Sequence, residues 1–196
     1  MNTRVNKSTT YLYSYIAFFL LLFSSNTIFA QDVYLCVWRN PERTMTRIFP
    51  EAKDYVTVNL KISQKECEAI EKELGFELLP GQRDRFQYFQ MTGEGGKQIG
   101  TIIAASQKGE YGAIEFVIGF DTTGTLKDIY IQRSRERDQS FKDRSFLDQF
   151  KNIRMEELKK LKKDFKDPLT KGKLAVIDGI IKEVVTYKKL VTEKKQ

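Results

Sequence analysis

The sequence predicts an α+β domain in which a four-stranded antiparallel sheet carries helices packed mainly on one face. Two runs rich in β-branched and aromatic residues, 113–120 and 125–132, flank the turn Asp121-Thr-Thr-Gly124 and indicate a β-hairpin. Two earlier apolar runs, 83–91 and 99–105, are joined to each other and to the hairpin by glycine-containing turns. Because these connections are short, an antiparallel meander is the most economical topology.

Three elements are predicted before these strands. Proline is tolerated at the first position of a helix, so Pro41–Ile48 is predicted as a short helix. Tyr55–Ile62 alternates polar and apolar side chains, which is typical of a half-buried strand. Ser63 and Glu66 form a capping-box pattern that begins a further helix, and Gly75 marks its end.

The chain after the hairpin is predicted to be mainly helical. A charged loop, Arg133–Arg144, precedes apolar residues at helical spacing over 146–150. Residues 155–165 alternate leucines and lysines in the pattern of a short amphipathic helix. A break at Asp164–Lys173 separates this segment from the last helix, which runs from Leu174 to about Lys189.

Residues 1–30 are interpreted as a signal peptide. Two basic residues near its start precede a mostly apolar run at 11–23, and a polar segment then leads to Ala30, after which we expect cleavage. A retained membrane anchor is the alternative, but the apolar run is shorter than the span of about 20 residues that a bilayer requires. We therefore expect an exported, periplasmic domain over residues 31–196.

The chain has no histidine, and this absence excludes several kinds of chemistry. Serine–histidine and cysteine–histidine nucleophile systems are excluded, together with histidine-rich zinc and iron sites. The sequence also has no glycine-rich nucleotide-binding motif. No catalytic residue or metal ligand is therefore predicted, and a bound organic cofactor is one source of chemistry that remains.

Charge and cysteine content leave alternatives open. The 33 lysines and arginines exceed the 26 acidic residues only modestly, which does not indicate a nucleic-acid-binding protein. An anionic cofactor, an acidic partner or a membrane surface would each suit this excess, and so would a solvated lysine-rich helix face. In an exported chain, Cys36 and Cys67 form either a disulfide or two separate buried thiols.

A set of short motifs occurs in a fixed order between residues 111 and 150. They are Tyr111-Gly112, Val117-Ile-Gly119-Phe-Asp121, Gly124, Arg135-Glu136 and Phe146-Leu-Asp-Gln-Phe150. This order resembles the FMN-binding domain of flavin-carrying subunits in membrane quinone and ferredoxin reductases, and of small periplasmic relatives. The resemblance extends back to about Ile48. It implies a flavoprotein that passes electrons rather than an enzyme with its own substrate.

The resemblance also implies a place for the cofactor. In this family a Ser/Thr-Gly-Ala-Thr segment precedes the last helix, and a separate flavin transferase can esterify its final threonine to the FMN phosphate. Alignment on the last helix puts Thr170 in the place of that threonine. Asp167, Pro168 and Leu169 replace the three preceding residues, and Pro168 and Leu169 are stiffer or bulkier than the residues they replace. Covalent and non-covalent FMN binding both stay open.

The residues at the start of the last helix suit a phosphate on physical grounds as well. A helix N-terminus presents free N–H groups and a partial positive charge. Thr170 adds a hydroxyl, and Gly172 allows close approach of the backbone. Lys171 and Lys173 add positive charge. In the alternative interpretation, Asp167 caps the helix and nothing binds there.

The resemblance places the isoalloxazine ring of FMN on the side of Gly112 and Glu136. Gly112 is alternatively a simple turn glycine, and Glu136 a solvated loop charge. The preferred function is an exported FMN-binding electron carrier with a redox partner protein in the cell envelope. It would bind no nucleic acid, and would meet the membrane only if the N-terminal segment is retained. The alternative is a flavin-less member of the same fold that serves as a binding or assembly module.

Overall fold

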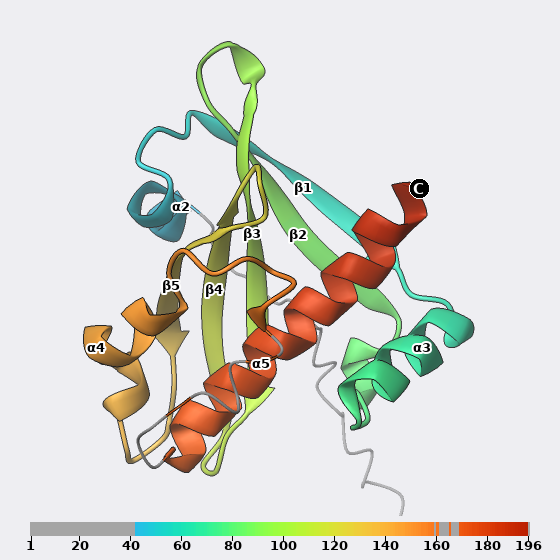
Figure 1. Ribbon diagram of the computed structural model, residues 1–196, viewed down its shortest axis with the longest axis vertical. Helices are drawn as coiled ribbons and strands as arrows, with labels where there is room; N and C mark the ends of the chain where they lie inside the picture. Colours follow the sequence, from blue (N-terminus) through green and yellow to red (C-terminus); the bar gives the residue numbers. More distant parts are fainter. Residues whose placement is uncertain (1–41, 159, 161–164, 166–168, 196) are drawn as a thin grey trace, which may run out of the picture. The chain divides into compact units, whose positions relative to one another are not determined.

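The computed structural model describes residues 42–158, 160, 165 and 169–195 (Figure 1). All of them belong to one unit of the chain, Asp32–Gln196. The predicted signal peptide lies outside the described residues, and so do Cys36, Asp167 and Pro168. Within the described part, no helix combines the length and the apolar character that crossing a bilayer requires.

Five antiparallel strands form one sheet in chain order, which is the predicted meander with one strand more. They are β1 (Asp54–Lys61), β2 (Arg85–Thr92), β3 (Gln98–Lys108), β4 (Ala113–Asp121) and β5 (Leu126–Arg133). The α+β class is confirmed, whereas the prediction of four strands is wrong. The additional strand is β1, which pairs with β2 from Asp54 opposite Thr92 to Lys61 opposite Arg85.

The place of β1 in the sheet escaped prediction for a physical reason. Strands β2 to β5 follow one another through short turns, so their pairing is visible in the local sequence. Residues 62–84 separate β1 from β2 and include a helix, so no turn signal links these two strands. The alternation over Tyr55–Ile62 indicates a strand, but the neighbour of that strand is decided by tertiary packing.

Four α-helices accompany the sheet in the described part of the chain. They are α2 (Glu42–Ile48), α3 (Gln64–Leu74), α4 (Arg144–Leu147) and α5 (Lys171–Tyr187). Helix α5 begins three residues before the predicted Leu174 and continues into a π-helical turn at Lys188–Thr192. Of the helix predicted over 155–165, Met155–Glu157 form turns, and most of the remainder lies outside the described residues.

Helix α5 crosses one face of the sheet and packs mainly on β3 and β4 (Figure 1). Gly179 allows this close contact, because a Cβ at this position would lie 2.7 Å from Cζ of Phe116. Val176, Ile180 and Val184 of the same helix are buried. Each such side chain contributes about 1.5–3 kcal/mol by leaving water. The packing of α5 therefore accounts for much of the hydrophobic core.

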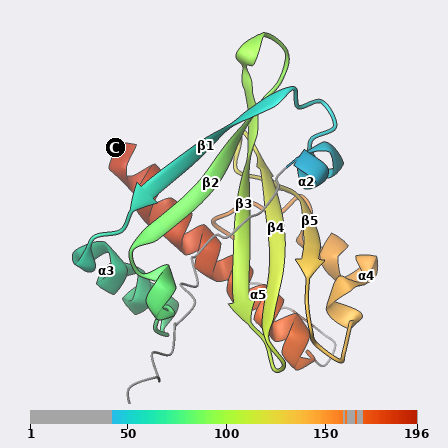
Figure 2. The same ribbon diagram turned by 180° about the vertical axis from the view of Figure 1, so that it is seen from behind.

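The end of α2 covers part of the opposite face of the sheet (Figure 2). Ile48 and Phe49 pack on Gly119, where a Cβ would lie 2.2 Å from Cγ2 of Ile48. Because Gly119 and Phe116 are three residues apart in β4, they point to opposite faces. Both faces of the sheet thus carry helical or helix-terminal residues.

Two local signals in the sequence are confirmed by the structure. Ser63 and Glu66 form the reciprocal capping box of α3. In the β4–β5 turn, the Asp121 carboxylate accepts the N–H groups of Thr123 at 2.8 Å and of Thr125 at 2.9 Å. These bonds satisfy backbone donors that the turn would otherwise leave to water.

Candidate functional site

Three segments that are distant in the sequence meet at one end of the sheet (Figures 1 and 2). They are the β3–β4 turn Gly109–Gly112, the loop Arg135–Phe141 after β5, and the start of α5, Thr170–Lys173. We refer to this region as the α5 corner. It contains all six residues predicted to bind the cofactor, which are Gly112, Glu136, Thr170, Lys171, Gly172 and Lys173.

Two direct contacts join these segments. Nζ of Lys171 lies 2.6 Å from Oε1 of Glu110, which ties the start of α5 to the β3–β4 turn. The N–H of Tyr111 donates to Oε1 of Glu136 at 2.8 Å, which ties the same turn to the loop after β5. The predicted site residues are therefore brought together by the fold.

Thr170 is the N-cap of α5. Its Oγ1 accepts the N–H of Lys173 at 3.3 Å, and its hydroxyl donates to the Asp138 carboxylate. The hydrogen bond from Thr170 lowers the pKa of Asp138, and the N–H and hydroxyl of Ser140 lower it further. The alternative in which Asp167 caps this helix is wrong, because Thr170 occupies the cap position.

The first turn of α5 retains donors for a ligand. The N–H groups of Lys173 and Leu174 bond to Oγ1 and the carbonyl oxygen of Thr170. The N–H groups of Lys171 and Gly172 form no hydrogen bond to another described residue, and Gly172 is buried. Such orphan donors, at the positive end of a 17-residue helix, are the groups that bind phosphates and carboxylates in proteins.

The two lysines of this turn have different surroundings. Lys171 is exposed, and the hydrogen bond to Glu110 raises its pKa. Nζ of Lys173 lies 5.4 Å from the centre of the Phe146 ring, a cation–π distance. An exposed ion pair contributes little to stability, so Lys171 can exchange Glu110 for another anion at small cost.

Glu136 holds the β3–β4 turn. Only 6% of this residue is exposed, and its Oε1 would lie 2.4 Å from a Cβ on Gly109. Gly112 has a φ of 152°, a backbone angle that residues other than glycine rarely adopt. Its carbonyl oxygen accepts the N–H of Gly109. Gly112 is thus a turn glycine, and the alternative of Glu136 as a solvated charge is wrong.

Two aromatic residues of the α5 corner, Tyr111 and Phe141, have different surroundings. Phe141 is buried against Gly172, where a Cβ would lie 2.5 Å from its Cδ1. Tyr111 is 44% exposed, and the Arg137 guanidinium lies 4.7 Å from the centre of its ring. Tyr111 therefore offers a flat ring at the surface, whereas Phe141 supports the first turn of α5.

Sequence reasoning missed Asp138 as a residue of this corner. Its carboxylate accepts the N–H and the hydroxyl of Ser140, both at 2.9 Å, in addition to the Thr170 hydroxyl. The pattern Asp-x-Ser is typical of a turn in which a carboxylate bonds the backbone two residues later. That signal was present within the charged loop. Its proximity to Thr170 depends on tertiary structure.

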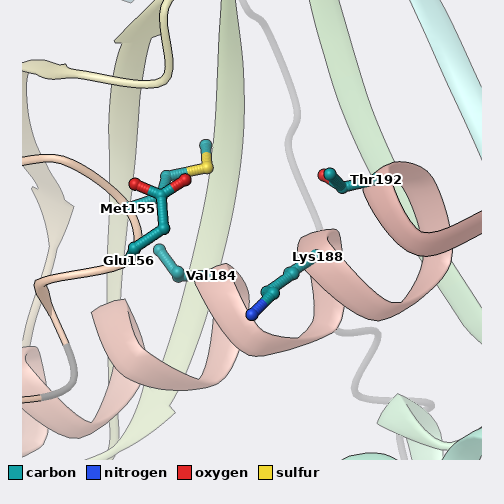
Figure 3. A pocket seen from close by; sticks show the side chains of 5 residues that line it. All are labelled: Met155, Glu156, Val184, Lys188 and Thr192. Atoms are coloured by element: carbon teal, nitrogen blue, oxygen red, sulfur yellow. The ribbon is translucent and has the colours of Figure 1, made fainter. Parts of the chain in front are cut away.

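A small pocket of about 100 Å³ lies beside the end of α5 and the π-helical turn that follows it (Figure 3). Its lining consists of Met155, Glu156, Val184, Lys188 and Thr192. Ligand pockets commonly hold roughly 300–1,000 Å³, so this one fits a few water molecules rather than a flavin ring. None of the predicted site residues lines it.

Cys67 is a free thiol, and burial raises its pKa. The alternative of a separate buried thiol is therefore confirmed for Cys67. Among the described residues, no group of three histidine, cysteine, aspartate or glutamate side chains is arranged to hold a metal ion.

Comparison with protein-family models and with curated proteins finds no match for this chain. The resemblance to FMN-binding domains consequently remains a proposal, and its support comes from the geometry of the α5 corner.

Proposed function

We propose that this chain is an exported FMN-binding electron-transfer domain whose flavin occupies the α5 corner. One observation carries the proposal: the fold brings Gly112 and Glu136 next to Thr170–Lys173, although about 60 residues of sequence separate Gly112 from the helix. The domain acts as a carrier that exchanges electrons with a partner in the cell envelope. It has no substrate of its own to transform.

The start of α5 supplies the groups that would hold the FMN phosphate. The N–H groups of Lys171 and Gly172 bond to no other described residue, and the Thr170 hydroxyl lies beside them. Lys171 and Lys173 add two positive charges. Charge-assisted hydrogen bonds of this type are about twice as strong as bonds between neutral groups. FMN supplies a redox group that takes up and releases electrons without histidine or metal.

The β3–β4 turn would support the flavin ring. Glu136 fixes this turn by accepting the N–H of Tyr111, and the Tyr111 ring is exposed next to Gly112. An exposed aromatic ring beside backbone without a side chain can stack on another flat ring. This chain's contribution is therefore to orient the flavin while leaving one edge accessible to a partner.

Titration of the purified chain with FMN, followed by quenching of flavin fluorescence, tests the proposal. We expect saturable binding of FMN and about tenfold weaker binding of riboflavin, which lacks the phosphate. Lys171→Gln with Lys173→Gln should weaken FMN binding. The matched pair Lys61→Gln with Lys65→Gln should leave it unchanged. Equal affinity for FMN and riboflavin would place the phosphate elsewhere.

The proposed export has its own measurement. N-terminal sequencing of the protein from its native host should begin at Gln31. An intact Met1 in the membrane fraction would instead show that the N-terminal segment is a retained anchor.

A flavin-less binding module is the second candidate, and one observation favours it. The chain's own carboxylate, Asp138, already holds the Thr170 hydroxyl that the phosphate would use. Leu169, the residue before Thr170, is partly buried against the core rather than small and open. If neither the native chain nor Asp138→Asn binds FMN, also when co-expressed with a flavin transferase, this second function replaces the first.

A further inference from the structure

Five exposed cations cluster around the β3–β4 turn and the loop after β5. They are Lys108, Arg133, Arg135, Arg137 and Lys142, named here the basic surface. Lys108 ends β3 and pairs with Ala113 at the start of β4, and Arg133 ends β5 opposite Glu115 of β4. The remaining three follow in the loop that meets the start of α5. The cluster thus lies at one end of the sheet.

No member of the basic surface forms an ion pair with a carboxylate anywhere in the described part of the chain. Cations elsewhere are commonly paired, as Arg83 is with Glu71 and Lys127 with Glu51. Exposed cations such as Lys61, Lys65 and Lys97 are also unpaired among the described residues, so the basic surface is distinguished by having five of them together at one end of the sheet.

The acidic groups of the same region are largely engaged. Glu136 accepts a backbone N–H, and Glu110 pairs with Lys171. Asp138 accepts hydrogen bonds from Ser140 and from Thr170, the N-cap of α5. Glu136 is buried, whereas Glu110 and Asp138 remain exposed, so the five cations of the basic surface outnumber the exposed carboxylates beside them and the net field is positive.

An exposed aromatic residue lies among these charges. The Tyr111 ring is 44% exposed and carries the Arg137 guanidinium above it. Tyrosine and arginine are the residue types most enriched at the energetic centres of protein–protein interfaces. A cation cluster with such a pair has the composition of a docking surface rather than of a solvated charge run.

We propose that the basic surface docks the acidic face of a partner protein. The exposed carboxylates of Asp138 and Asp143 lie between the cations, and a uniformly anionic membrane or nucleic acid would repel them. A folded protein can place its own cations opposite these two carboxylates and its acidic groups opposite the arginines. Such complementary charges chiefly raise the rate of association and give a strong dependence on salt.

The docking proposal does not depend on bound flavin, because the basic surface consists of side chains of this chain alone. With flavin present, it would bring a redox partner to the α5 corner. Without flavin, it would serve the binding module. A measurement of docking that does not follow electron transfer therefore keeps the two proposals separate.

The test uses the isotope-labelled full chain, with β-lactoglobulin as a folded acidic probe at low ionic strength. We expect that the probe shifts backbone resonances only in residues 108–112 and 133–143. These shifts should disappear when added salt shortens the screening length to about 10 Å or less. Arg133→Gln, Arg135→Gln and Arg137→Gln combined should weaken binding at least about tenfold. Tyr111→Ala should weaken it with all charges retained.

The matched control replaces three exposed lysines outside the surface, Lys61→Gln, Lys65→Gln and Lys97→Gln, and changes the net charge equally. Retained binding by this control supports the proposal. Equal loss in both variants, or resonance shifts spread over all lysines, would show a net-charge effect and overturn it. Binding to vesicles of equal parts phosphatidylserine and phosphatidylcholine, without binding to the protein probe, would overturn it in favour of a membrane.

Discussion

The Thr170 hydroxyl caps α5 and at the same time donates to the carboxylate of Asp138. One oxygen atom thus caps the start of the helix, bonds to the Asp138 carboxylate and lies where the phosphate of FMN is proposed to bind. Stability of the helix and affinity for flavin are consequently coupled at this residue.

Replacement of Thr170 separates these two roles. Thr170→Val keeps the branched shape and removes the hydroxyl, so the free energy of unfolding should fall by about 1 kcal/mol through loss of the cap. FMN affinity should fall about tenfold, or the flavin mass adduct should disappear if attachment is covalent. Urea unfolding, flavin titration and mass analysis measure the three effects. Thr170→Ser, the control, should keep stability and non-covalent affinity. A valine variant with native stability would contradict the cap.

Asp138 should oppose the binding of phosphate. The Thr170 hydroxyl and Ser140 lower the pKa of Asp138 in the folded protein. The ionised Asp138 therefore stabilises the fold at pH values above its pKa in the unfolded chain. This stabilisation is lost as pH falls through its lower pKa in the folded protein. Asp138→Asn should therefore flatten the acid limb of the stability curve and tighten FMN binding. Asp143→Asn, in the same loop, is the control. Unchanged flavin affinity in Asp138→Asn would exclude the proposed opposition.

The buried Lys182 should be among the least replaceable polar residues. Its Nζ donates to the carbonyl oxygen of Ser106 at 2.6 Å and lies 3.6 Å from Oε1 of Glu183, and only 1% of Lys182 is exposed. Lys182→Ala removes the cation beside a buried carboxylate, which costs about 3–5 kcal/mol of unfolding free energy. Lys188→Ala, at an exposed position of the turn that continues α5, should change the unfolding free energy by less than about 0.5 kcal/mol.

Replacing both members of this pair tests the reason for the loss. Lys182→Met with Glu183→Leu removes both charges, and Gln82 Nε2 still donates to the Ser106 carbonyl oxygen. Apolar replacements of buried ion pairs are often neutral or stabilising. The double variant should therefore regain most of the stability that Lys182→Ala loses. A double variant as unstable as the single one would show that packing, not charge, is responsible.

Glu66 should give the chain an acid-sensitive contact between α3 and Lys194 near the C-terminus. The hydrogen bond from Lys194, helped by Ser63, lowers the pKa of Glu66 from 4.5 to about 2. Its stabilising effect is thus complete above pH 4.5 and is lost as pH falls toward 2. In Glu66→Gln, the dependence of unfolding free energy on pH should flatten in this window. Glu68→Gln on the same helix should retain the native pH dependence.

Local chemistry explains what the sequence could predict. The capping box at Ser63 and the turn at Asp121–Gly124 depend on residues within a few positions of each other. The partner of β1 and the burial of Lys182 depend on segments far apart. Lys182 belongs to a lysine-rich helix that predicts solvation. It is buried because Ser106 and Gln82 provide its hydrogen bonds.

The same limit applies to the candidate site. The resemblance to a known family implied which residues would gather, and the fold does bring them together. The resemblance could not indicate that Glu136, which lies within a run of charged residues, is buried and accepts the Tyr111 N–H. Nor could it indicate that Asp138 reaches Thr170, because that contact requires the loop after β5 to fold onto α5.

The separation of β1 from β2 by residues 62–84 has a consequence for the order of folding. Strands β2 to β5 are joined by short turns, so closing them costs little chain entropy, whereas joining β1 requires closure of a longer loop. We expect the β2–β5 meander to form first and β1 to add to its edge later. In pulse-labelled hydrogen exchange during refolding, amides of β1 should become protected after those of β3 and β4. The molecule would then pass through a state whose β2 edge is unpaired and open to another chain, so refolding yield should fall as protein concentration rises.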